Sequence, residues 1–332
     1  MVRLNFSKLV FMAALILAAE GCTREPSPEG VPEESSMAPQ PTSLKVKALP
    51  GTAYAGSMTV WALSSGEIRR ATDTDGSLEM ELPSRERTDI FVALNPTGGS
   101  DTENPFEAVT DLSEVDIDAI PCFGGTTGFV PEPGEQDIKV SVRRVLAKIT
   151  LGSIVNHLSE APFAGQAIRI DSLFIINGKG RFPLFADDTL MSAVNWFMPS
   201  GARDEGTGQM AAPPFSGISL GGEELPFGMS ARVSATLYCG PNPLSEDSFS
   251  SEAAQPWTPR KTRLVLACRI GGERCYYPLT INDVRTNTHY SVSTLTITRF
   301  GTSAPDLPFS FDSPSVGAAI VGWDEIESEE II

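Results

Sequence analysis

One serine of the chain stands in a pattern that hydrolases use for nucleophilic catalysis. Gly217, Ser219 and Gly221 match G-x-S-x-G, and Asp283 and His289 follow in the order of an α/β-hydrolase triad. That motif needs a strand before the serine and a helix after it, whereas here loop-like sequence rich in Pro and Gly lies on both sides. We therefore interpret Ser219 as part of a surface loop and predict that the protein is not an enzyme.

Other patterns that could bind metals or phosphates are incomplete. The two histidines, His157 and His289, have no zinc-ligand spacing, and the cysteines form no CxxC pair. Residues 73–76 (DTDG) open like a calcium loop but lack its closing glutamate. Residues 178–180 (GKG) lack the third glycine and the following helix of a dinucleotide site. We interpret both runs as hairpin turns and expect no metal and no cofactor.

Two cysteines have a spacing that suggests a structural role. Cys268 and Cys275 flank Gly271 and Gly272 symmetrically, and a two-residue hairpin loop at these glycines would place the cysteines opposite each other. They are candidates for a cross-strand disulfide, which an exported protein can form. Cross-strand geometry is often strained, so the sequence leaves this pairing open.

The N-terminus has the pattern of a bacterial export signal. A short basic segment precedes an apolar run at residues 9–19, which is too short to span a bilayer as a stable helix. The run ends in Ala-Glu-Gly-Cys, which resembles the lipobox that is cut before a lipidated cysteine, although Glu20 stands where a small residue is commoner. We predict a signal peptide at residues 1–21 and lipidation (palmitate) of Cys22. The alternative is an ordinary secretory signal with an incidental cysteine.

Composition limits the partners. Residues 22–42 are rich in Pro, Glu and Ser with little to bury, which predicts a disordered tether. The formal net charge of −17 argues against nucleic acid and anionic lipid headgroups as partners. Because no later run is apolar for 18 residues, the lipid would be the protein's only membrane attachment.

Apolar and polar residues alternate along most of the chain, which indicates strands with one buried face. The expected strands lie at residues 44–49, 58–63, 78–82, 90–94, 138–142, 145–151, 168–170, 173–176, 232–238, 263–270, 275–281, 290–298 and 316–321. Residues 113–120 and 154–158 are expected as short helical turns. The sequence therefore predicts an all-β protein of two tandem antiparallel β-sandwiches, at residues 43–158 and 159–332, with Greek-key-like, transthyretin-like connections.

Five stretches, taken in order, carry a family resemblance. They are residues 90–95 (IFVALN), 142–149 (VRRVLAKI), 168–177 (IRIDSLFIIN), 287–301 (NTHYSVSTLTITRFG) and the C-terminal run 316–321 with Trp323. Together with the lipobox, they resemble the fimbrillins, the type V pilins of Bacteroidales. The resemblance implies a non-enzymatic subunit of an adhesive fimbrium, made of two β-sandwiches.

The resemblance also implies a mode of assembly. In stalk subunits of that family an Arg-specific protease removes the lipidated N-terminus with the first strand, and the C-terminal strand of another subunit fills the groove by strand addition. Here residues 50–57 after the first strand contain no Arg and no Lys. We therefore expect an uncut, lipid-anchored base or accessory subunit. Its partners would be other fimbrial subunits, to which Val316, Ala318, Ile320 and Trp323 donate a strand.

Three alternatives stay open. One is a stalk or tip pilin cut at Arg69 or Arg70 or by another protease, and another is the hydrolase using Ser219. The third is a surface glycan-binding lipoprotein, although exposed aromatic clusters are usual there and the four tryptophans are scattered, at Trp61, Trp196, Trp257 and Trp323.

Overall fold

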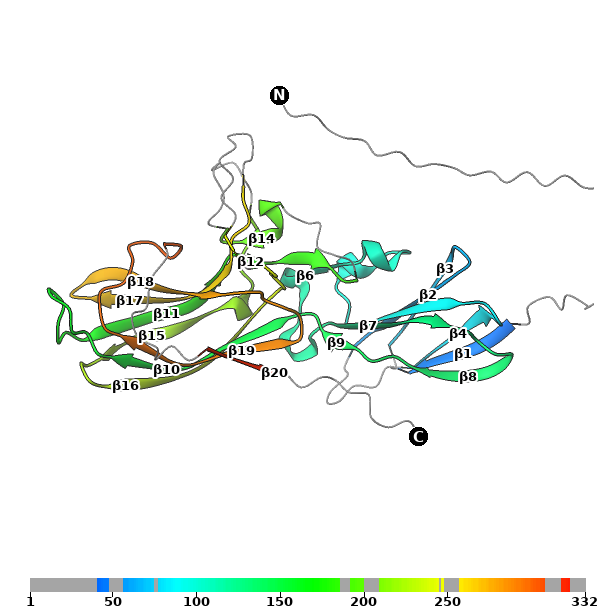
Figure 1. Ribbon diagram of the computed structural model, residues 1–332, viewed down its shortest axis with the longest axis horizontal. Helices are drawn as coiled ribbons and strands as arrows, with labels where there is room; N and C mark the ends of the chain where they lie inside the picture. The colour runs from blue at the N-terminus through cyan, green and yellow to red at the C-terminus, as the bar shows by residue number, and fades with distance from the viewer. Residues whose placement is uncertain are drawn as a thin grey trace, which may run out of the picture. The chain divides into compact units, whose positions relative to one another are not determined.

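Within the residues that the structure describes, the chain is built of β-strands, and its helical segments are short 3-10 turns. The computed structural model describes residues 41–47, 56–74, 77–185, 192–199, 209–244, 246–247, 257–307 and 318–322. The all-β prediction is confirmed, and the strands pack as face-to-face sheets in the manner of β-sandwiches (Figure 1).

Two sheets in the first half of the chain enclose a hydrophobic core. Their orders are β3-β2-β5-β7-β9 and β4-β1-β8. The strands are β1 (Pro41–Lys47), β2 (Met58–Ser64), β3 (Glu67–Asp73), β4 (Ser77–Pro83), β5 (Thr88–Leu94), β7 (Cys122–Phe129), β8 (Gly134–Lys139) and β9 (Arg143–Arg144). Val60 and Val92 of the first sheet join Met80 and Ile138 of the second in one buried cluster. Alternate residues thus point into the core, as the period of a strand requires.

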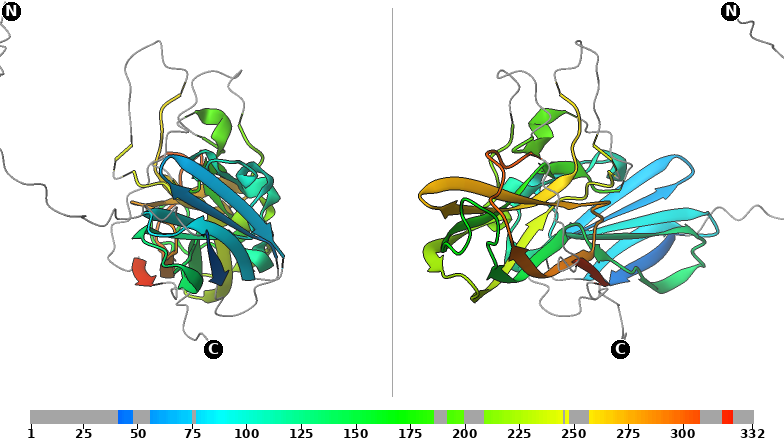
Figure 2. Two further views of the ribbon diagram at one scale, coloured as in Figure 1. Left: turned by 90° about the vertical axis from the view of Figure 1, so that its right-hand side faces the viewer. Right: turned by 60° about the vertical axis from the view of Figure 1, so that its left-hand side comes forward.

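Two four-stranded sheets form the second half, and the right-hand view of Figure 2 shows one lying over the other. Their orders are β16-β10-β19-β20 and β15-β11-β17-β18. The strands are β10 (Ala147–Asn156), β11 (Ile168–Ile176), β15 (Gly217–Leu225), β16 (Ser230–Cys239), β17 (Thr262–Ile270), β18 (Glu273–Ile281), β19 (Thr288–Ile297) and β20 (Ala318–Gly322). Their core includes Ile149 and Val292 of one sheet and Ile170 and Leu266 of the other. The chain changes sheet between β10 and β11, β15 and β16, β16 and β17, and β18 and β19.

β2 is buried on both faces. Met58 and Val60 face the core between the first two sheets, whereas Trp61 faces the other way and is fully buried. The indole nitrogen of Trp61 donates a hydrogen bond to the carbonyl oxygen of Thr102 at 2.9 Å, and its ring packs edge-on against Phe185. Burial on both faces explains why β2 reads as a continuous apolar run.

Short ladders complete the described fold. β6 (Val109–Asp111) pairs with β13 (Arg181–Pro183), and β12 (Gly178–Lys179) pairs with β14 (Trp196–Phe197). The first of these ladders joins the segment after β5 to the segment after β11. It therefore ties together two stretches of chain about 70 residues apart, since a ladder fixes both backbones.

The predicted hairpin at Gly271 and Gly272 is confirmed. β17 and β18 pair from Thr262 to Ile281 across these two residues, and both glycines have positive φ angles, 60° and 87°. A two-residue turn with positive φ at both positions matches the twist of the flanking strands, and glycine adopts it without a steric cost.

Other local predictions were wrong. Residues 154–156 continue β10 rather than forming a helical turn. Residues 178–180 lie in and after β12, which pairs with β14, so this run does not close a hairpin. The predicted turn at residues 73–76 lies partly outside the described residues, and the strands on either side of it, β3 and β4, belong to different sheets. β3, β7 and β15 were not predicted, because their sequences carry Gly or charge on both faces.

Sheet membership changes between β9 and β10. β10, which the predicted division placed before residue 158, pairs with β16 and β19 of the second half. Trp61 and Ala93 also belong to the same buried cluster as the second core. The division into domains at residues 43–158 and 159–332 stays a prediction.

Candidate strand-exchange site

β1 is the middle strand of its sheet. It runs antiparallel to β4, with Lys45 opposite Glu79, and parallel to β8, with Lys45 in register with Asp137. Both of its edges are therefore paired, and β4 and β8 contact β1 rather than each other. Removal of β1 would leave two facing rows of unpaired backbone groups, an arrangement that accepts an added strand. We call the space between β4 and β8, which β1 fills, the slot.

One wall face of the slot is apolar. Leu78, Met80 and Leu82 of β4 are at most 8% exposed, and Ile138 of β8 is 9% exposed. These side chains belong to the first core, so the slot opens directly onto it. An added strand would have to present apolar residues at every second position to replace what β1 covers.

The opposite wall face of the slot is mainly acidic. Glu79 and Glu81 of β4 and Glu135 and Asp137 of β8 are exposed, and Lys139 at the end of β8 is the basic residue on this face. Lys45 of β1 forms a salt bridge with Glu79, with 3.1 Å between Nζ and Oε1. The sequence predicts a strand at residues 78–82, but no feature of it shows that β1 lies between β4 and β8, so this acidic setting could not be predicted.

The predicted donor segment is partly described. β20 pairs antiparallel with β19, with Ala318 opposite Val292 and Ile320 opposite Tyr290. It is the terminal strand of its sheet among the described residues. Val316 and Trp323, also predicted as donor residues, lie outside the described residues, as does the predicted lipidation site Cys22.

Tyr290, opposite Ile320 of β20, fixes the start of β19. Its hydroxyl donates to the carbonyl oxygen of Asp283 at 2.7 Å and accepts from the backbone amide of Arg285 at 3.0 Å. Burial raises the pKa of the phenol, so the hydroxyl keeps its proton for the bond to Asp283. Tyr290, one of the residues in the run 287–301, therefore holds the β18–β19 connection.

A close backbone contact explains why residue 301, the last of the run 287–301, is glycine. A Cβ on Gly301 would come within 2.5 Å of the carbonyl oxygen of Tyr276. The adjacent Thr302 exchanges two backbone hydrogen bonds with Tyr276, at 2.8 and 2.9 Å. The chain after β19 therefore covers the outer edge of β18, and a larger residue than glycine would prevent it.

Cys268 and Cys275 are opposite each other in the β17–β18 ladder, and both are fully buried free thiols in the structure. Tyr276 directs its backbone N–H and C=O outward to Thr302, so the adjacent cysteine pair is the kind that exchanges backbone hydrogen bonds across the ladder. Side chains of such pairs are the more widely separated, which disfavours the short Cβ separation of a disulfide. The disulfide stays a prediction.

The hydrolase motif is dispersed. Ser219 lies within β15, exposed, in a strand rather than on a turn before a helix. His289 lies in the sheet that does not contain Ser219, and its imidazole forms a hydrogen bond with the Thr150 hydroxyl at 2.9 Å. Asp283 forms a salt bridge with Arg285. No hydrogen bond between described residues joins the three side chains of the motif. In the described part of the chain, no cluster of three or more His, Cys, Asp or Glu could hold a metal.

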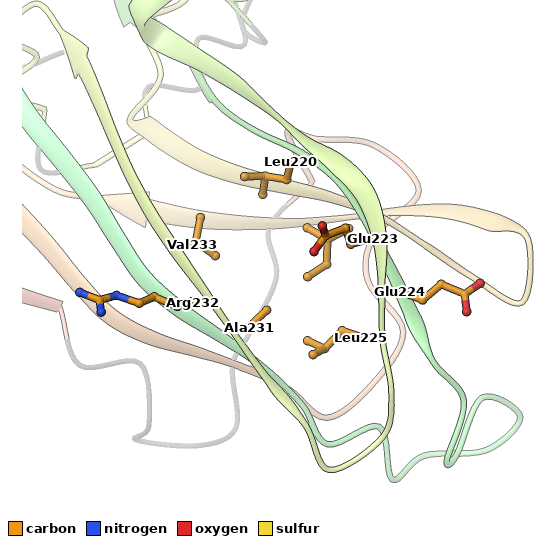
Figure 3. A pocket seen from close by; sticks show the side chains of 8 residues that line it. Leu220, Glu223, Glu224, Leu225, Ala231, Arg232 and Val233 are labelled. Carbon is orange, nitrogen blue, oxygen red and sulfur yellow. The ribbon is translucent and has the colours of Figure 1, made fainter.

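A small cavity opens between the edge strands β15 and β16 (Figure 3). Its volume is about 100 Å³, and Leu220, Leu225, Ala231 and Val233 lie between the two strands. The charged side chains of Glu224 and Arg232 point away from it in opposite directions. Glu223 also lines the cavity, and its carboxylate lies between the two strands. The space suits one aliphatic side chain, and a single carboxylate is less than the several convergent polar groups of a small-molecule site.

The described tryptophans do not form a sugar-binding platform. Trp61 and Trp196 are fully buried and Trp257 is 7% exposed, while Trp323 lies outside the described residues. Half-buried phenylalanines do gather near Trp61, but Phe91 meets both Phe106 and Phe185 edge-on. Edge-on rings offer no shared flat face for a sugar to stack on.

None of the helices among the described residues is long and apolar enough to cross a bilayer.

The fold is shared with surface proteins of Bacteroidales. No protein-family profile and no curated protein matches the sequence. Among solved structures, a putative cell adhesion protein from Parabacteroides distasonis ATCC 8503 has a TM-score of 0.57 and 16% identity, covering 86% of this chain and 100% of that one. A fimbrilin from Porphyromonas gingivalis W83 has a TM-score of 0.57 and 13% identity, covering 87% and 99%. A putative cell adhesion protein from Bacteroides eggerthii DSM 20697 has a TM-score of 0.56 and 13% identity, covering 86% and 96%. The chain therefore has the fimbrillin-like fold that its sequence motifs predicted.

Proposed function

We propose that this protein is a subunit of an adhesive fimbrium, held at the outer membrane surface by a lipid on Cys22, and that it serves as a base or accessory subunit. The shared fold and the export signal support membership of a surface appendage. The observation that carries the base assignment is the position of β1 in the slot, combined with a connection to β2 that contains no Arg and no Lys at residues 48–57.

Cleavage at the next arginines is a poor route to an open slot. Arg69 and Arg70 lie in β3, beyond β2. A cut there would release β2 together with β1, and β2 is an inner strand paired with both β3 and β5. It contributes fully buried side chains such as Met58 and Trp61 to both cores. Loss of large buried side chains costs about 3–5 kcal/mol each, so the sheet would not survive the cut.

The C-terminal segment is the proposed donor. β20 is joined to the rest of its sheet by a single five-residue ladder to β19. An edge strand of this kind is the part of a sheet that can leave or extend at least cost, since the inner strands keep their own partners. We assign Val316, Ala318, Ile320 and Trp323 to the segment that enters the slot of another fimbrial subunit, with main-chain hydrogen bonds supplying affinity.

The mature N-terminus tests the base assignment. Mass spectrometry of the surface form should find a chain that starts at Cys22 and carries acyl groups. A start beyond β1 in the surface form would contradict the permanent lipid anchor, and a start after Arg70 would favour the stalk alternative.

A C-terminal deletion tests the donor assignment independently. Removal of residues 315–332 should leave the protein folded and lipidated but prevent its incorporation into fimbriae. Unchanged incorporation would remove the donor role. Replacement of exposed Phe227 at the β15–β16 turn by Ser provides a matched surface control, because this residue lies outside both the slot and β20.

A further inference from the structure

The two walls of the slot carry negative charge on their outer face around Lys45. Glu79 and Glu81 of β4 stand on one side of β1, and Glu135 and Asp137 of β8 stand on the other. All four are exposed, and the next outward residue of β8 is the exposed Lys139, in register with Lys47. A strand that enters the slot therefore has to place its residue at the Lys45 position, and the outward residue two positions before it, between carboxylates on both walls.

β1 meets this requirement with a lysine. Lys45 is in register with Glu79 on one side and with Asp137 on the other, and its ammonium group lies 3.1 Å from the Glu79 carboxylate. The side chain of Lys45 is 40% exposed and that of Glu79 is 65% exposed, so the pair alone contributes little stability. Lys45 matters for the comparison with other strands, because an acidic residue at the same position would be repelled by two carboxylates at once.

The apolar face of the slot cannot discriminate in this way. Many extended segments have apolar residues at alternate positions, and the backbone hydrogen bonds are the same for all of them. Specificity among such segments needs an element that opposes the wrong ones. The acidic walls supply that element.

The C-terminal segment of this chain lacks the matching charge. No Lys or Arg follows Arg299, whereas Asp324, Glu325, Glu327, Glu329 and Glu330 follow β20 closely. The same segment from a second copy would therefore bring acidic residues, and no cation, toward the acidic walls.

We propose that the slot is selective for charge: it accepts β1, or an extended strand with Lys or Arg between Glu79 and Asp137, and it discriminates against the C-terminal segment of a second copy. This inference rests on the proposed strand exchange. It means that the protein does not polymerise with itself through the slot and that the donor strand is given to a different subunit.

The test uses the full-length chain with a cleavable Gly/Ser linker inserted between β1 and β2. After cleavage, β1 stays bound without a covalent link, and its release is followed by a fluorophore at its end. Competitors are a peptide of residues 39–49, the same peptide with Lys45→Glu, and a peptide of residues 312–332. We expect the first to exchange and the other two to bind at least about tenfold more weakly, with the difference reduced in 1 M salt.

A charge swap makes the test decisive. In the E79K/D137K variant the order of the β1 and Lys45→Glu peptides should reverse, whereas the control E160K/E273K, with the same change in net charge outside the slot, should keep the original order. Melting of the uncut protein gives a second readout: Lys45→Glu should lower the Tm, and Lys45→Glu with E79K should recover it. Equal binding of the three peptides, or an unaltered Tm in Lys45→Glu, would overturn the inference.

These results separate the inference from the proposed function. The peptide and melting measurements report on the slot in vitro, whereas the mature N-terminus reports on anchoring in the cell. A cleaved N-terminus with intact charge selectivity would refute only the anchor, and an acylated Cys22 with a non-selective slot would refute only the selectivity.

Discussion

Replacement of one buried asparagine should measure how strongly its side-chain hydrogen bonds stabilise one end of the second sandwich. Asn156, at the end of β10, is fully buried. Its Nδ2 donates to the carbonyl oxygens of Leu225 at 2.8 Å and Gln166 at 2.9 Å, and its Oδ1 accepts from the amide of Leu158 at 3.1 Å. The side chain thus joins β10, the loop after it and the end of β15.

The magnitude follows from these three bonds. At about 1 kcal/mol for each hydrogen bond, Asn156→Ala should lower the free energy of unfolding by about 3 kcal/mol, because it leaves three backbone groups without this partner. Urea unfolding with an unchanged slope is the measurement. Ser153→Ala on the same strand removes a half-buried hydroxyl and should cost less than about 1 kcal/mol.

A second substitution sharpens the test. Asn156→Asp keeps an acceptor but turns carboxylate oxygen toward two carbonyl oxygens. Burial and these dipoles should raise the pKa of the new carboxyl, so its destabilisation should diminish as the pH falls and the group gains a proton. A loss of less than 1 kcal/mol for Asn156→Ala, or no pH dependence for Asn156→Asp, would refute this account of the clamp.

Three further predictions concern charges and thiols. Asp247→Ala leaves Arg263, only 4% exposed and 2.7 Å from that carboxylate, without its partner, and should cost about 3–5 kcal/mol in thermal or urea unfolding. Burial first, and a neighbouring lysine second, lower the pKa of His289. Because the unfolded chain then binds the proton more readily than the folded chain, the neutral imidazole contributes stability that is complete above pH 6.5 and is lost as the pH falls through the folded pKa. The variant His289→Gln should remove this pH dependence from a profile of stability against pH. Burial raises the pKa of Cys122 to about 11 and that of Cys239 to about 12, so iodoacetamide at pH 8 should modify these thiols only after unfolding, as counted by mass spectrometry.

Local sequence was enough to predict strands whose two faces differ. β17 and β18 were found because their apolar residues recur and glycines mark the turn between them. β7 (CFGGTTGF) and β15 (GISLGGEEL) were missed, because their strand conformation comes from pairing with β5 and β11 rather than from their own composition. In β15, Gly221 and Gly222 form a bulge opposite Asp171, which is a tertiary arrangement and leaves no local pattern.

The candidate site also has residues that the local sequence predicts and residues whose setting it does not predict. The candidate residues of the C-terminal strand could be predicted from their alternation, and Lys45 could be recognised as a polar residue between two apolar ones. Its position between Glu79 and Asp137 could not be predicted, because it depends on which strands become neighbours after a separation of about 90 residues. Pairing across such distances is set by the whole fold and not by the segments themselves.

The parallel pairing of β1 with β8 also sets an order of events as the chain folds. In an exported chain β1 and β4 emerge early from the translocation channel, but the second wall of the slot does not exist until Lys139 has followed them. Until then β1 has at most one partner, and closing the long loop to β8 is among the slower steps open to this half of the chain. β1, the first strand of the fold along the chain, is therefore among the last to gain both of its pairing partners. The insertion of an uncut β1 between β4 and β8 is thus a late step, similar to the addition of a strand from another molecule.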